Sequence, residues 1–373
     1  MDSFINTVMG SQPRGLHNFI SEIRNVKSKE EERERVNKEL GNIRSKFSTA
    51  SSLTSYQKKK YVWKLCYVYM LGYEVDFGHV EFISLLGAQH YTEKSVGYMA
   101  VALLLKPGDR LLDLVVNSVR NDLHSNQMFA KTLALSAIAN VGGNEFAETL
   151  AQDVAKMITV PLDTGGSFLP PADANPKAEA AEIHRNRSAL IKKTCLCLLR
   201  MYRTNPDCLH PDNWVSYCCK LIEDQDLGVV TSAMSLVLGL TSHNVHIFEP
   251  LVPYVLELFR RLLAGTAANI SLEYTYYRLA SPWILCKCLR FLQYFKEPEG
   301  QEWEKLDKCL TQILSNVQDT ENINKANAEY ALTFEAMTLV VSWGPSSTEN
   351  ASHAELRKKT HALLGKYIAV RPS

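Results

Sequence analysis

Apolar residues recur at helical spacing along almost the whole chain, and no segment shows a sustained alternation of apolar and polar residues. The most apolar segments are rich in Ala, follow short polar turns and recur at intervals of roughly 40 residues. That interval is typical of HEAT and armadillo helix pairs, which stack into a solenoid with one continuous core. We therefore expect an all-α solenoid of stacked helix pairs over residues 1–373. Its apolar helices should cover residues 92–105, 126–141, 187–202, 228–240, 281–294 and 327–341.

One stretch interrupts this pattern. Residues 161–186 contain four prolines and two glycines. Proline fixes the backbone and removes a hydrogen-bond donor, so a regular helix is not expected at this density. The sequence predicts a long loop inserted into one repeat.

Positive charge is concentrated at the amino-terminal end of the chain. The net charge of the whole chain is +1, but residues 1–64 contain thirteen Lys and Arg against seven acidic residues. Lys58, Lys59 and Lys60 are consecutive at the expected start of a helix, where cations oppose the helix macrodipole. Because backbone N–H groups at a helix start attract anions, we predict a site for a multiply charged anion such as a phosphorylated lipid headgroup. A solvated lysine cluster is the alternative.

Two helices should carry this basic region. The first is predicted to begin at Ser28, with Glu31 completing a capping box. Its single apolar stripe is typical of an outer helix packed through one face. That stripe consists of Val36, Leu40, Ile43 and Phe47.

The second helix, after a polar break at residues 48–54, carries the three consecutive lysines. Lys60 and Lys64 are i, i+4 neighbours. We expect their ammonium groups to lie together on the exposed side of the helix, with Trp63 beside them. The predicted buried face consists of Tyr61, Leu65, Val68 and Tyr69.

No residue pattern points to catalysis, a metal site or a cofactor. The sequence contains no HExxH, no GxSxG, no phosphate-binding glycine loop, and no Cys or His pairs with zinc spacing. The nine cysteines are expected to be reduced, mostly core residues of a cytosolic protein. We expect no signal peptide and no membrane span, so membrane contact would be peripheral.

Several short runs of residues occur in the order seen in the large adaptins. They are Arg14-Gly15-Leu16, Lys58 to Val62, Leu71-Gly72-Tyr73, Asp76-Phe77-Gly78-His79, Tyr91 to Lys94, Ile138 to Gly142, Cys197 to Arg200 and Tyr274 to Tyr277. The chain therefore resembles adaptins, and its basic amino-terminal run resembles the alpha type in particular. Alpha-type adaptins are large, non-catalytic subunits of the plasma-membrane clathrin adaptor, a heterotetramer with beta, mu and sigma subunits. The resemblance implies an α-solenoid on the cytoplasmic face of the plasma membrane, in clathrin-coated pits.

The resemblance also implies two binding roles. Alpha-type adaptins help to recognise acidic dileucine cargo signals near the sigma subunit, through an arginine that corresponds to Arg24. They also bind phosphatidylinositol bisphosphate and related inositides through a basic patch. The positions that match this patch are Arg14, Gly15, Lys46, Tyr56, Lys58, Lys59, Lys60, Tyr61 and Lys64. Five or six basic residues at about 1 kcal/mol each would give reversible binding.

Two other interpretations remain open from sequence. A large subunit of another vesicle coat, of the Golgi adaptor or coatomer type, would not need the lysine cluster. An importin-type carrier would read basic peptides in an acidic or Asn-lined groove, but no regular Trp/Asn ladder recurs here. Adaptins continue beyond this length into a hinge and an appendage. We therefore expect the solenoid to be incomplete at its carboxy-terminal end, either because the sequence is partial or because a partner covers that end. Clathrin and accessory-protein binding are not assigned to this chain.

Overall fold

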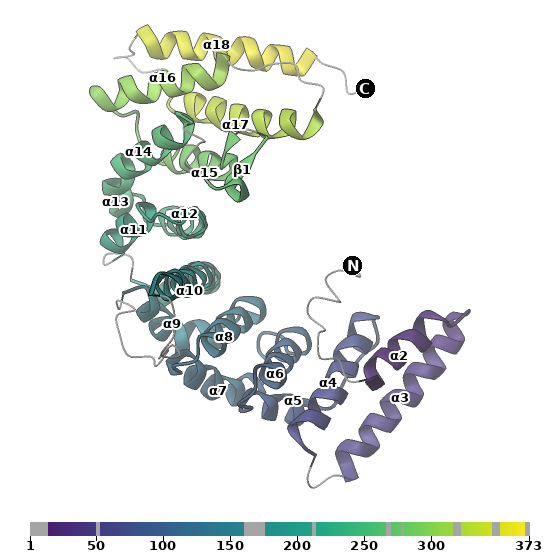
Figure 1. Cartoon of the computed structure of the whole chain (residues 1–373). Helices are drawn as coiled ribbons and strands as arrows, with labels where there is room; N and C mark the ends of the chain where they lie inside the picture. Colours follow the sequence, from purple (N-terminus) through teal and green to yellow (C-terminus); the bar gives the residue numbers. More distant parts are fainter. Residues whose placement is uncertain are drawn as a thin grey trace. The chain divides into compact units, whose positions relative to one another are not determined.

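The computed structural model describes residues 14–49, 53–159, 176–210, 214–265, 270–277, 279–315, 322–344 and 351–369. The chain divides into two compact units, Met1–Cys208 and Leu209–Ser373 (Figure 1). Both units consist of stacked helices, so the predicted all-α solenoid is confirmed.

The helices of unit 1 stack in two rows. In one row α4, α6, α8 and α10 each pack on the next, and the second row contains α5, α7 and α9 (Figure 1). Pairs such as α5 with α6 and α9 with α10 join the rows. The described elements are α2 (Arg14–Arg24), α3 (Lys29–Thr49), α4 (Ser55–Met70), α5 (His79–Leu86), α6 (Tyr91–Leu104), α7 (Leu112–His124), α8 (Met128–Val141), α9 (Asn144–Thr159), α10 (Pro176–Thr204) and the 3₁₀ helix η1 (Pro206–Cys208).

Unit 2 repeats this arrangement. The helices α12, α15 and α17 form one row, and α11, α14, α16 and α18 form the other. A β-hairpin with two residues in each strand precedes α15. Thr275 lies opposite Ala280, and Tyr276 lies opposite Leu279. The described elements are α11 (Val215–Ile222), α12 (Leu227–Thr241), α13 (Val245–Phe248), η3 (Glu249–Leu251), α14 (Val252–Leu263), η5 (Leu272–Tyr274), β1 (Thr275–Tyr276), β2 (Leu279–Ala280), α15 (Pro282–Leu292), α16 (Gln301–Ser315), α17 (Ile323–Ser342) and α18 (Ala351–Ala369).

The six predicted apolar helices correspond to α6, α8, α10, α12, α15 and α17. All of them belong to the row of α4, α6, α8 and α10 in unit 1 or to the row of α12, α15 and α17 in unit 2. In these rows, helices of the same row and of the other row together cover several faces of each helix. Small residues make this close packing possible: Ala134 and Ala137 of α8 and Ala233 of α12 are buried. Helices covered on several sides need apolar residues around most of their circumference, which explains why the sequence signal was strong here.

The prediction of a loop over residues 161–186 is wrong for the last part of this range. Residues 176–186 belong to α10, which begins at Pro176. Proline is tolerated in the first helical turn because its missing N–H would have no intrahelical partner there. The remainder of the predicted loop, residues 161–175, lies outside the described residues.

The predicted start and apolar stripe of α3 are confirmed. The Glu31 N–H donates to Ser28 Oγ over 3.2 Å, as expected for a helix that begins after Ser28. The Glu31 carboxylate accepts from the N–H of Lys27 over 3.4 Å, one residue earlier than in a capping box. Of the predicted stripe, Val36 and Ile43 are buried, and Leu40 and Phe47 are partly buried.

Helix α4 begins earlier than its lysines suggested. Thr54 and Gln57 form a full capping box, so Ser55 is the first helical residue. Lys58 to Lys60 therefore follow the first turn, and their conflict with the helix macrodipole is smaller than predicted. Leu65 and Val68 are buried and Tyr61 is partly buried, but Tyr69 is exposed, contrary to expectation.

The nine cysteines are all free, as predicted, and six of them are buried. Burial raises the pKa of the Cys66 thiol to about 12, so this thiol is protonated at neutral pH. In the described part of the chain, no helix combines the length and apolarity that a bilayer span requires.

Candidate anion-binding site

The basic region lies where α2, α3 and α4 meet. Phe19 and Ile23 of α2, Val36 of α3 and Val68 of α4 form one buried cluster. The ring of Phe19 also packs edge to face on Tyr67, with 6.0 Å between ring centroids. These apolar contacts fix α2 against α4 and bring the start of α2 close to the lysine run.

Gly15 and Lys60 are direct neighbours. A Cβ atom on Gly15 would lie 2.7 Å from Lys60 Cε and 3.0 Å from Lys60 Nζ. The ammonium group of Lys60 therefore lies against the first turn of α2, where backbone N–H groups lack intrahelical acceptors. Such groups and an ammonium together favour a bound anion. The structure thus brings together two predicted site residues that are 45 positions apart in the sequence.

Among the described residues, no Asp or Glu pairs with the other two lysines of the run. Lys58 Nζ donates to Ser84 Oγ of α5 over 3.0 Å. Lys59 is only 5% exposed, and its Nζ lies 5.6 Å from the ring centroid of Tyr56, itself 52% exposed. Lys60 Nζ lies at the same distance from the ring centroid of Tyr61.

Lys64 is buried and paired with a carboxylate, so the prediction that its ammonium group lies exposed beside that of Lys60 is wrong. It is 6% exposed, and its ammonium group pairs with the carboxylate of Glu39 on α3 over 2.5 Å. The i, i+4 rule placed Lys64 on the same face as Lys60. This part of α4 is covered by α2 and α3, which turns the lysine into a buried structural residue.

Glu39 and Lys64 are the centre of a charge network between three helices. Glu39 also accepts from Arg35 over 3.0 Å, and Arg35 pairs with Glu22 of α2 over 2.6 Å. Burial raises the pKa of Glu39, but hydrogen bonds and charges from Lys64 and Arg35 outweigh this effect and lower its pKa. Glu39 is therefore ionised at neutral pH and holds two cations.

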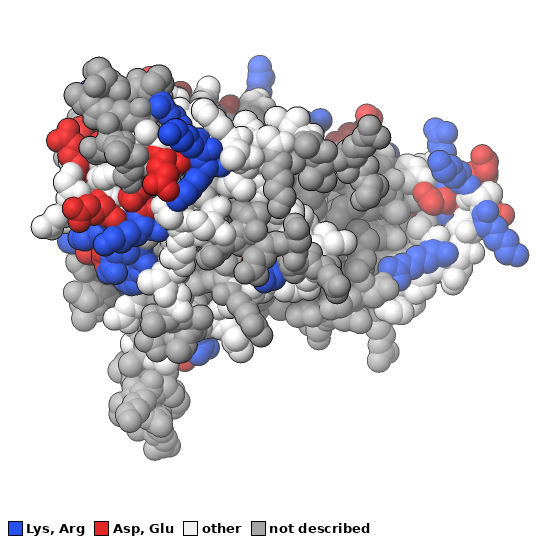
Figure 2. All heavy atoms as spheres, turned by 90° about the horizontal axis from the view of Figure 1, so that it is seen from above, with Lys and Arg blue, Asp and Glu red and all other residues white. Residues whose placement is uncertain are grey.

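Several other cations of unit 1 pair with carboxylates, unlike the three lysines of the run. Lys64 pairs with Glu39, Arg44 with Asp76, and Lys94 with Asp122. On the face seen in Figure 2, Lys and Arg side chains lie beside Asp or Glu in several places. Within the described ranges, none of Lys58, Lys59 and Lys60 has an Asp or Glu partner.

The remaining predicted site residues lie around this cluster or away from it. Lys46 is exposed in the last turn of α3, and Tyr61 packs edge to face on Phe47. Arg14 is the first residue of α2, and its side chain lies outside the described part. Arg24 is exposed at the other end of α2, about 14 Å from Gly15 along the helix axis. The structure therefore separates the predicted cargo residue from the lysine run.

Two residues of this region were not singled out from sequence. Glu39 lies on the apolar stripe of α3, three residues after Val36 and four before Ile43. A charged residue at a buried position usually has a buried partner, so this position could have indicated the pairing with Lys64. No sequence signal marked Ser84, because its contact with Lys58 joins two helices.

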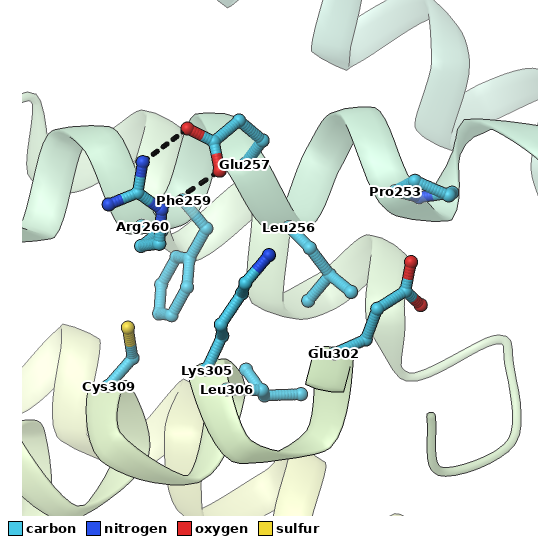
Figure 3. Close-up of a pocket in the computed structure, with 9 residues that line it drawn as sticks. All are labelled: Pro253, Leu256, Glu257, Phe259, Arg260, Glu302, Lys305, Leu306 and Cys309. Carbon is cyan, nitrogen blue, oxygen red and sulfur yellow. Dashed lines mark hydrogen bonds and ion pairs between the residues drawn. The ribbon is translucent and has the colours of Figure 1, made fainter. Parts of the chain in front are cut away.

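A hollow in unit 2 is a weaker candidate for a binding site than the lysine run. It lies between α14 and α16, has a volume of about 150 Å³, and is lined in part by Leu256, Phe259 and Leu306 (Figure 3). Its Arg260 already pairs with Glu257 over 2.5 Å. Nowhere in the described ranges do three His, Cys, Asp or Glu side chains form a metal site.

The chain is similar to known adaptor subunits. AP-2 complex subunit alpha-1 of Arabidopsis thaliana is 40% identical over 359 residues, which cover 96% of this chain and 32% of that protein. AP-2 complex subunit alpha-2 of Dictyostelium discoideum is 36% identical, with 96% of this chain and 33% of that protein covered. AP-1 complex subunit gamma-1 of Schizosaccharomyces pombe is 26% identical over 83% of this chain and 33% of that protein.

The chain thus spans about a third of the length of the curated relatives it matches. The sequence profile described as the Adaptin N terminal region matches residues 32–162 and 181–373. The unmatched residues between these ranges fall within the predicted insertion. Because the profile covers most of the chain, the chain belongs to the adaptin family and contains the amino-terminal region of an adaptin.

Proposed function

We propose that this chain works as the alpha-type large subunit of a clathrin adaptor, a non-catalytic scaffold that assembles with beta, mu and sigma subunits. The similarity to AP-2 alpha subunits from a plant and an amoeba supports this assignment, and the lower identity to an AP-1 gamma subunit agrees with it. Membership of the adaptin family removes the importin-type interpretation. The place of action would be the cytoplasmic face of the plasma membrane, in clathrin-coated pits.

The lysine run of α4 is the proposed contact with the membrane, through phosphatidylinositol bisphosphate and related inositides. The observation that carries this proposal is that Lys58, Lys59 and Lys60 have no carboxylate partner among the described residues. A buried or half-buried ammonium without a counter-ion is costly, and a bound phosphate would provide the missing charge. Gly15 leaves room for Lys60 at the start of α2.

The remaining members of the site are proposed to surround the phosphates. They are Arg14, Lys46, Tyr56 and Tyr61. Arginine can hold a phosphate through two parallel hydrogen bonds, and the tyrosine hydroxyls can donate further ones. Lys64 acts indirectly, because its pairing with Glu39 fixes α4 against α3.

The strength of this site suits a reversible contact. Each basic residue near an anionic surface contributes about 1 kcal/mol. A handful of such residues gives weak binding on its own, so stable attachment needs simultaneous contacts by cargo or by partner subunits. We propose that Arg24 supplies one cargo contact, to the acidic residue of a dileucine signal. Its position at the far end of α2 allows both ligands to bind together.

Vesicle sedimentation tests the membrane contact. The protein is mixed with phosphatidylcholine vesicles with or without phosphatidylinositol bisphosphate, and Lys58, Lys59 and Lys60 are replaced by Gln in a triple variant. The matched control replaces Arg357, Lys358 and Lys359 of α18 by Gln, which removes the same charge from unit 2. Circular dichroism confirms that both variants stay folded.

The expected loss for the α4 variant is about 100-fold in inositide-dependent binding, from three cations at about 1 kcal/mol each. The α18 variant should bind like the unchanged chain. Equal binding by the α4 variant and the unchanged chain would overturn the proposed membrane site. Equal losses in both variants would show that net charge, and not this site, attracts the vesicles.

A further inference from the structure

Ser84 links the lysine run to a neighbouring helix. Its Oγ accepts a hydrogen bond from Lys58 Nζ over 3.0 Å and donates one to the backbone carbonyl of Glu81 over 2.7 Å. Ser84 is exposed and lies in the last turn of α5, which packs on α4. A hydroxyl group that is open to solvent therefore lies within hydrogen-bond distance of the proposed anion site.

We propose that Ser84 is a phosphorylation site whose modification closes the anion site on α4. This inference rests on the proposed function, because it needs an inositide site to regulate. The donor would be ATP, used by a serine/threonine protein kinase. Ser84 Oγ would attack the γ-phosphorus, the bond between that phosphorus and the bridging oxygen of ADP would break, and the hydroxyl proton would pass to solvent.

The phosphoryl group would act as a ligand that is built into the chain. It carries close to two negative charges at neutral pH and three acceptor oxygens. Lys58 is already 3.0 Å from the Ser84 hydroxyl oxygen, so its ammonium would pair with the new group without a large movement. Glu81, one turn earlier on α5, carries a like charge and would favour a phosphoryl group turned towards Lys58.

The effect on membrane binding follows from the charge balance. Two added negative charges cancel the contribution of two cations at the site, each worth about fivefold in affinity for an anionic surface. Phosphoserine at position 84 should therefore weaken inositide-dependent vesicle binding by about 30-fold. Removal of the hydroxyl alone, in Ser84→Ala, leaves all three lysines in place and should change binding by no more than about twofold.

The test inserts phosphoserine at position 84 during translation and measures sedimentation with phosphatidylcholine vesicles that contain phosphatidylinositol bisphosphate. The matched control inserts phosphoserine at Ser136 of α8, whose Oγ likewise accepts from a lysine, Lys193, over 2.6 Å. Phosphatase treatment of each protein reverses the modification. The unchanged chain and the triple Gln variant of α4 are measured in parallel.

The expected result is a loss with phosphoserine 84 that phosphatase reverses, and no comparable loss with phosphoserine 136. In the background of Lys58→Met, phosphoserine 84 should cause a smaller further loss, because its main partner is gone. Full binding with phosphoserine 84, or equal losses at both positions, would overturn the inference while the proposed function stands. If the unchanged chain and the triple variant bind alike, both the proposed function and this inference fail.

Discussion

Replacing Glu39 with Gln tests the charge network that holds α2, α3 and α4 together. Glutamine has the size of glutamate but no charge, so Lys64 loses its carboxylate partner. The Lys64 side chain is only 8% exposed, so water cannot readily replace that partner. Breaking a buried ion pair from one side costs about 3–5 kcal/mol. Arg35 retains Glu22 over 2.6 Å, so the second cation of the network stays paired. We therefore expect a loss near the lower end, about 3 kcal/mol of local stability.

Lys64→Met provides the matched comparison. It removes the buried cation but leaves Glu39 paired with Arg35 over 3.0 Å, and methionine suits the apolar surroundings beside Phe19. The expected cost is about 1 kcal/mol. The double variant Glu39→Gln/Lys64→Met should be more stable than Glu39→Gln alone, because no buried cation is left without a partner.

Hydrogen–deuterium exchange on the whole chain measures these changes in the peptides of α2 to α4, independently of unfolding in unit 2. Lys64 and Arg35 lower the pKa of Glu39 in the folded chain, against the opposing effect of burial. The stabilisation that ionised Glu39 provides is then complete at pH values above about 4.3, the pKa of a Glu side chain in the unfolded chain. It is lost as the pH falls through the lower pKa of Glu39 in the folded chain. The difference between Glu39→Gln and the unchanged chain should thus be present at neutral pH and disappear in acid. Equal exchange at neutral pH, or a difference that does not change with pH, would refute the reasoning.

Three further predictions follow from other contacts. Asp122→Asn removes the carboxylate that accepts from the buried Lys94 ammonium over 2.7 Å, and exchange in α6 and α7 should show a loss of about 3 kcal/mol; unchanged protection would contradict the role of this pair. Gly142 has φ 67° and ψ −158°, and a Cβ there would lie 2.9 Å from the Arg200 guanidinium. Gly142→Ala should therefore lower the free energy of unfolding, measured by chemical denaturation, by about 2 kcal/mol; an unchanged value would show that the backbone relaxes. Arg24→Ala should weaken binding of an acidic dileucine peptide to the assembled complex about tenfold and leave vesicle binding intact; equal losses would contradict two separate sites.

The sequence was informative where helices need apolar residues on several faces. All six predicted apolar helices exist, and each lies in the row that contains α4, α6, α8 and α10 in unit 1 or α12, α15 and α17 in unit 2. The single stripe of α3 was also recognised, because a helix packed through one face leaves a clear pattern. These features depend on spacing along one segment, which sequence displays directly.

Contacts between helices were harder to anticipate. Helical spacing placed Lys60 and Lys64 on one face, but it does not tell how far α2 and α3 extend along that face. The result is that Lys60 lies against Gly15 while Lys64 is buried with Glu39. Tyr69 was assigned to the core by the same rule and is exposed. Which face of a helix is covered depends on its neighbours, and those contacts involve residues far apart in the chain.

The most direct measurement is a crystal structure of this chain with inositol hexakisphosphate. The account predicts phosphate oxygens about 2.7–2.9 Å from the Nζ atoms of Lys58 and Lys60, beside the Gly15 backbone, with Lys64 still paired to Glu39. A ligand that binds at other cations of the chain while Lys58 and Lys60 keep their present contacts would contradict it.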